Sequence, residues 1–143
     1  MILVPLLFTL GLAALAQPAP AVQDDATVLA RRAARELAAA WTNDGFKLRD
    51  SDWTGSFTPG KSQLIQVSLF AGNRYWFSAA ATGGGALALG IYDESGKPLT
   101  VESYEDGPRA AAGFRPDASG PYLVKIEQRG DQASSFCLVY SYK

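Results

Sequence analysis

The chain has 143 residues, which is enough for one domain with one hydrophobic core and too few for two domains of ordinary size. Its 13 basic and 14 acidic residues are mixed along the sequence, so it lacks the basic patch by which proteins bind nucleic acids. It has no histidine, which excludes Ser/His/Asp and Cys/His nucleophiles, two-histidine zinc sites and imidazole proton transfer.

The first sixteen residues, MILVPLLFTLGLAALA, carry no charged side chain and end in the small-x-small pattern of a signal-peptidase site. This pattern predicts a secretory signal peptide at residues 1–16 and a periplasmic or extracellular protein. Only the amino terminus of Met1 supplies positive charge, so an uncleaved membrane anchor is the competing interpretation, although the apolar run is shorter than the ~20 residues that span a bilayer. Residues 17–23 form a Pro/Ala-rich linker.

Residues 24–42 have the pattern of an amphipathic helix. Asp24 and Asp25 can cap its start, and Asn43-Asp44-Gly45 is a stop signal. The apolar face is mostly alanine and Glu36 lies among its arginines, so packing against the rest of the domain is favoured over binding to an anionic membrane. The stripe expected to pack recurs at every fourth residue and consists of Leu29, Ala33, Leu37 and Trp41.

In residues 46–143 the period of the apolar residues changes to two, which is the period of β-strands. Turn-forming glycines separate the runs. Short strands at this spacing predict a mainly β protein, an antiparallel sandwich whose inward residues meet in one core. The expected inward residues are Ile65, Val67, Leu69, Tyr75, Phe77, Ala79, Leu87, Leu89, Ile91, Tyr122, Val124, Ile126, Phe136, Leu138 and Tyr140.

The segment 90–98, GIYDESGKP, brings together more reactive side chains than any other. It is not a phosphate-binding loop, because Lys97 is followed by proline instead of serine or threonine. Asp93 and Glu94 are adjacent and would point apart in a strand, whereas the paired carboxylates of glycosidases face each other across a cleft. Asp93 can accept bonds from amides two residues on, and Gly96 can adopt a left-handed conformation, so the segment predicts a hairpin turn.

The only cysteine, Cys137, lies in the apolar run 135–140. With one cysteine the chain cannot form an internal disulfide, so the fold of an exported domain must be stabilised by its hydrophobic core alone. The apolar surroundings favour a packed, buried side chain over a reactive thiol.

Four segments between Gly55 and Tyr142 combine apolar alternation with turn residues, in the order LFAGNRYWFSA, LALGIYDESG, FRPDASGPYLVKI and SFCLVYS. In order and spacing they resemble the bacterial pre-peptidase C-terminal (PPC) domain family. The resemblance implies a secreted, jelly-roll-like β-sandwich that accompanies peptidases and other exported enzymes and has no catalytic residues or cofactor. Some related modules bind calcium, and the weak candidates for such a site here are Asp44, Asp50 and Asp52.

Five aromatic residues fall outside the expected inward register: Trp53, Trp76, Tyr92, Tyr104 and Tyr142. Trp76 is expected to be buried beneath the helix, against Trp41. Tyr104 lies in the acidic, loop-like segment 102–107 and is the best candidate for an exposed contact. Because exposed rings stack on sugars and anchor protein partners, the candidate binding residues are Trp53, Tyr104 and Tyr142.

The sequence therefore predicts an exported, non-catalytic β-sandwich module that binds a protein or polysaccharide ligand, with no membrane contact beyond its signal peptide. One alternative is a structural envelope protein anchored by an uncleaved N-terminus. Another is a small carboxylate- or metal-dependent hydrolase that uses the acids between residues 44 and 52 or between residues 102 and 106.

Overall fold

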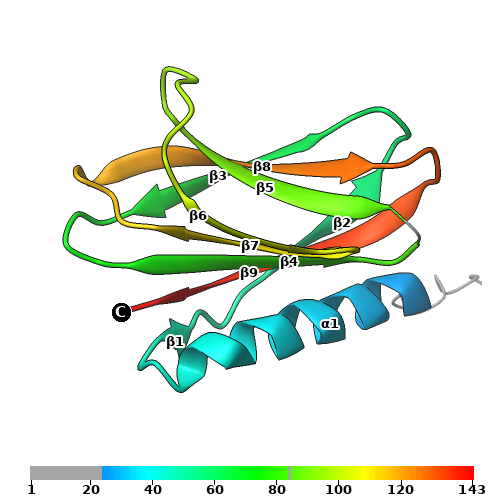
Figure 1. Ribbon diagram of the computed structural model, residues 1–143, viewed down its shortest axis with the longest axis horizontal. Helices are drawn as coiled ribbons and strands as arrows, with labels where there is room; N and C mark the ends of the chain where they lie inside the picture. Colours follow the sequence, from blue (N-terminus) through cyan, green and yellow to red (C-terminus); the bar gives the residue numbers. More distant parts are fainter. Residues whose placement is uncertain (1–23, 84) are drawn as a thin grey trace, which may run out of the picture.

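The computed structural model describes residues 24–83 and 85–143, so the predicted signal peptide at 1–16 and linker at 17–23 lie outside the described residues. Within the described residues, one helix precedes the strands (Figure 1). The elements are α1 (Asp25–Thr42), β1 (Lys47–Leu48), β2 (Trp53–Phe57), β3 (Gln63–Leu69), β4 (Tyr75–Ala81), β5 (Ala86–Asp93), β6 (Glu102–Asp106), β7 (Arg109–Phe114), β8 (Gly120–Arg129) and β9 (Ser134–Tyr142).

The strands form two antiparallel sheets. The larger sheet has the order β1-β9-β4-β7-β6. Strand β2 also belongs to it and pairs with β9 along the same edge as β1, but further from the end of β9. The smaller sheet has the order β3-β8-β5. Early and late strands therefore alternate within each sheet, as in a jelly roll. The predicted fold, a mainly β, jelly-roll-like sandwich preceded by one helix, is confirmed.

The core lies between the two sheets. Of the fifteen residues expected to face inward, thirteen are buried, and Ile65 and Tyr140 are half-buried against the same cluster. Directly opposite residues of neighbouring strands point to the same face of a sheet. The period-2 pattern therefore gives each sheet one apolar face, and these two faces pack against each other. Full burial of each large apolar side chain contributes about 1.5–3 kcal/mol.

The helix covers the outer face of the larger sheet, so the molecule has three layers (Figure 1). Packing of α1 against the domain is confirmed, and Ala33 and Trp41 of the predicted stripe pack on the sheet, but Leu29 is 55% exposed and the fully buried residues lie one position further on. Alanines allow the helix backbone to approach the sheet closely, and this close packing outweighs the larger apolar area of the leucine. The buried helix residues are Ala30, Ala34 and Ala38, which pack against Ala80, Cys137 and Val139.

The segment GIYDESGKP forms the predicted turn. The Asp93 Oδ1 accepts hydrogen bonds from the Ser95 and Lys97 amides, both at 2.9 Å, and from the Ser95 hydroxyl at 2.6 Å. Gly96 has φ = 86°, a left-handed value that a side chain would strain. A bridge between Tyr92 and Pro98 closes the hairpin. The side chains of Asp93 and Ser95 therefore hold the turn together.

In the described part of the chain, the structure contains no helix long and apolar enough to cross a membrane.

Candidate functional site

The sheet end at which β9 finishes carries a cluster of aromatic rings and one arginine, which we call the aromatic end: Arg49, Trp53, Tyr140 and Tyr142. The Arg49 amide donates to the Tyr140 carbonyl at 3.0 Å, which fixes the Arg49 backbone beside β9. Its guanidinium carbon lies 4.7 Å from the Trp53 ring centroid and 5.2 Å from that of Tyr140. The two rings stack with centroids 5.8 Å apart. Such cation–π contacts hold an arginine in place while its N–H groups stay available.

Beside the aromatic end is a shallow cavity of about 360 Å³. Burial raises the pKa of the Tyr140 hydroxyl, while the nearby Arg49 opposes that rise. Tyr140 therefore stays protonated at neutral pH and can donate a hydrogen bond as well as present its ring. The lining residues are Arg49, Phe70, Asn73, Tyr75, Tyr140 and Tyr142.

Trp53 and Tyr142 were expected outside the inward register, and this expectation is wrong. Trp53 lies opposite Leu138, and Tyr142 lies opposite Tyr75, so both share the inward face of their neighbours. They are half-buried and pack against the edge of the core. The period of two continues along β9 through Tyr140 to its last residue, which is why this end has so many rings.

Tyr104 is 42% exposed, but the surrounding segment, expected to be loop-like, is strand β6. Tyr104 lies opposite Ala111 of β7, on the edge of the larger sheet away from β1 and β2. All five residues of β6 are exposed, and acidic side chains are typical of an edge strand that must not pair further. The structure therefore brings Trp53 and Tyr142 to one end, on either side of Tyr140, and places Tyr104 elsewhere.

The three acids considered for calcium are not brought together: no group of three metal-ligating side chains occurs among the described residues. Asp52 accepts from Arg31 Nε at 2.7 Å and lies 3.5 Å from Arg35 Nη2, so it ties α1 to the sheet. Asp44 uses its backbone carbonyl to accept from Lys143 Nζ at 2.8 Å.

Cys137 is fully buried between α1 and the larger sheet, as predicted. Burial raises the pKa of its thiol to about 12, and the charge of Asp52 adds to the rise. A thiol in this state has too little thiolate to act as a nucleophile at neutral pH.

Sequence reasoning did not single out Arg49 or Tyr140 as binding residues. No sequence motif marks Arg49, because it comes to lie over the rings only when β2 pairs with β9. Tyr140 was assigned to the core from its periodicity, and only the strand end leaves part of it accessible.

No family model matches the sequence, and no curated protein sequence is significantly similar to it. Among solved structures, it is similar to PliG from Aeromonas hydrophila, a periplasmic inhibitor of g-type lysozyme, at 16% identity and a TM-score of 0.48, over 65% of this chain and 85% of that one. A de novo designed double-stranded β-helix matches at 16% identity and a TM-score of 0.39, over 63% and 97% of the two chains. CBM4 matches at 13% identity and a TM-score of 0.41, over 64% and 82%. At these values the similarity extends to the β fold alone.

Proposed function

We propose that the protein is an exported, non-catalytic β-sandwich module of pre-peptidase C-terminal type that binds a protein or polysaccharide ligand. The observation that carries the proposal is the aromatic end, where Arg49 lies over Trp53 and Tyr140 beside a cavity. Within the described residues, Arg49 takes part in no ion pair. Its guanidinium is therefore held by rings and by its backbone, and its donors remain for a ligand.

The chemistry of the aromatic end suits a ligand with both a flat apolar face and hydrogen-bond acceptors. Rings offer apolar area at a small cost in side-chain entropy, and arginine offers donors in a planar fork. Sugar rings and the side chains of a protein partner both have these two properties. Aromatic residues and arginine are also the side chains that most often dominate the energy of protein interfaces.

Three of the groups that could support catalysis have structural roles instead. Asp93 binds the amides of its own turn, Asp52 pairs with Arg31 and Arg35, and Cys137 is buried as a thiol. The sequence has no histidine to serve as a general base. These observations favour binding over turnover.

The proposal is tested by probing the purified protein, expressed from the full coding sequence, against arrays of defined oligosaccharides and of peptides. Array members that bind are then measured by calorimetry with the wild type, R49Q and K61Q. Lys61 is exposed in the turn between β2 and β3, so K61Q matches the change in charge away from the aromatic end. We expect R49Q to weaken binding about tenfold, and K61Q to have no effect. An absence of binding to every array member, or equal affinities for wild type and R49Q, would contradict the proposal.

A further inference from the structure

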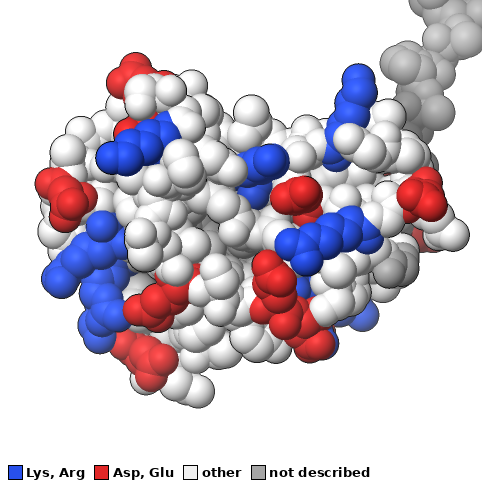
Figure 2. All heavy atoms as spheres, turned by 45° about the horizontal axis from the view of Figure 1, so that its top comes forward, with Lys and Arg blue, Asp and Glu red and all other residues white. Residues whose placement is uncertain are grey.

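Three basic residues lie side by side on the outer face of the larger sheet, and we call them the cationic row: Lys143, Arg74 and Arg115. Arg74 exchanges both backbone hydrogen bonds with Lys143, at 2.9 and 3.0 Å. On its other side, Tyr75 lies opposite Phe114, and one step along that register sets Arg74 opposite Arg115. Figure 2 shows lysine and arginine side chains at the left end of the molecule, with acidic side chains beside them.

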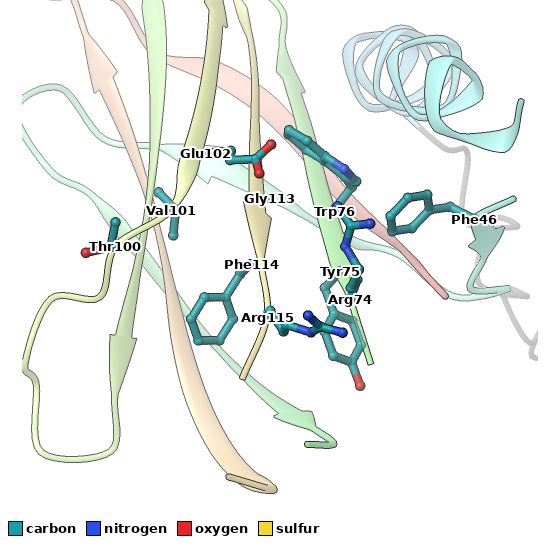
Figure 3. A pocket seen from close by; sticks show the side chains of 10 residues that line it. All are labelled: Phe46, Arg74, Tyr75, Trp76, Thr100, Val101, Glu102, Gly113, Phe114 and Arg115. Carbon is teal, nitrogen blue, oxygen red and sulfur yellow. The ribbon is translucent and has the colours of Figure 1, made fainter. Parts of the chain in front are cut away.

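A cavity of about 260 Å³ lies beside this row (Figure 3). Arg74 lines it from the residue before β4, Arg115 from the residue after β7, and Glu102 from the start of β6. The Phe46 ring lies under the row, with its centroid 5.8 Å from both the Arg74 guanidinium carbon and Lys143 Nζ. Gly113 leaves room at the floor for the Trp76 ring, since a Cβ there would meet that ring at 2.9 Å.

The cationic row forms no ion pair among the described residues. Like charges on opposite residues of a sheet are destabilising. Among the described residues, neither Arg74 nor Arg115 takes part in an ion pair, and the ammonium of Lys143 donates to a carbonyl, which carries no net charge. The backbone of Arg115 is fixed by the fully buried Pro116 that follows it. Two guanidinium groups that take part in no ion pair among the described residues, on one wall of a cavity that holds the single carboxylate of Glu102, are suited to an anionic ligand.

We propose that this cavity binds the carboxylate of an acidic sugar residue, of the uronic acid type, within a polysaccharide. Arg74 and Arg115 would hold the planar carboxylate through paired N–H donors, a geometry that arginine favours. Glu102 would accept hydrogen bonds from hydroxyl groups on the same sugar ring. A second carboxylate close by would be repelled by Glu102, so a unit with one carboxylate flanked by hydroxyls fits better than a run of acidic side chains. At about 260 Å³ the cavity accommodates one residue of a polymer.

This inference goes beyond the proposed function, because the cavity uses none of the four residues of the aromatic end. Each can therefore fail without the other. R49Q tests the aromatic end, and substitutions in the cationic row test the cavity.

The test is calorimetric titration of the full-length protein with three probes: oligoglucuronate, the same oligosaccharide with its carboxyl groups reduced, and an oligoglutamate peptide. We expect oligoglucuronate to bind more tightly at low than at physiological ionic strength, and the reduced form to bind at least about tenfold more weakly. R74Q and R115Q should each weaken oligoglucuronate binding about tenfold, whereas K61Q, with the same charge change elsewhere, should not.

Three results would overturn the inference: no binding of oligoglucuronate, equal binding of its reduced form, or tighter binding of oligoglutamate. Unchanged affinity in both R74Q and R115Q would do so as well. Urea unfolding of R115Q shows whether the variant folds. Because the substitution removes one of several neighbouring like charges, its urea midpoint should be equal to or above that of the wild type. A lower midpoint would show that Arg115 has a structural partner and would also contradict the inference.

Discussion

The Trp41 and Trp76 rings stack with centroids 3.9 Å apart and planes inclined by only 7°. Trp41 comes from the last turn of α1 and Trp76 from the outer face of β4, as the sequence predicted. Trp41 Nε1 also donates to the hydroxyl of the buried Ser78 at 3.2 Å. This pair joins the helix to the sandwich, so α1 belongs to the folded domain.

Replacement of Trp41 by alanine should lower the free energy of unfolding by about 3–4 kcal/mol, because it removes a packed ring and leaves a void against Trp76. Urea unfolding followed by circular dichroism measures this change. W41F keeps a ring but loses the indole N–H, which leaves the Ser78 hydroxyl without that donor. Its cost should be smaller, about 1–2 kcal/mol. Equal stability of W41A and the wild type would mean that the helix is not held by this contact.

The strands and their buried residues could be predicted from the sequence more accurately than the exposed residues of the candidate sites. Period-2 alternation identified the core positions because burial of one sheet face requires it, and the turn chemistry of Asp93 and Gly96 is local. The helix stripe was right at Ala33 and Trp41 but wrong at Leu29, because close packing on the sheet selected the alanines one position further on for full burial. The exposed residues of a site depend on strand order: Arg74 and Arg115 are 41 positions apart and become neighbours only through the β4–β7 ladder.

Cys137 should resist thiol reagents in the folded protein. Because burial raises its pKa to about 12, the thiol stays protonated at mildly alkaline pH, and helix and sheet also block access to it. Reaction with a chromogenic disulfide reagent should therefore be negligible in buffer and complete in concentrated urea. Stoichiometric labelling of the native protein, with an unchanged circular dichroism spectrum, would show that the helix does not cover this residue.

Asp93 should make stability depend on pH. Hydrogen bonds, first from the Ser95 side chain and then from the Lys97 amide, lower the pKa of Asp93 below its ordinary value of 3.8. A lowered folded-state pKa contributes stability above the unfolded-state pKa, and this contribution is lost as the pH falls through the folded-state pKa. D93N should therefore have a lower urea midpoint than the wild type at neutral pH, and the difference should shrink in acid.

The matched control is E94Q, which changes the charge at the neighbouring exposed position without touching the three hydrogen bonds to Asp93. It should unfold like the wild type at neutral pH. A D93N difference that persists unchanged in acid would mean that the carboxylate charge does not stabilise the turn.

Export should remove the first sixteen residues. The sequence ends its apolar run at Ala16, so the mature protein is expected to begin at Gln17. Intact-mass spectrometry of the protein recovered from the periplasm or culture medium measures this directly. Recovery of a chain that begins at Met1 from the membrane fraction would instead favour the anchored envelope protein.

The central claim is that the protein binds its ligand without changing it. The most direct test is to incubate the purified protein with the tightest-binding array member, measure the affinity by calorimetry, and then analyse the recovered ligand by mass spectrometry. We predict saturable binding that weakens in R49Q, with the ligand recovered at its original mass. Ligand cleavage at a rate that is lost when an aspartate or glutamate is replaced would contradict the claim.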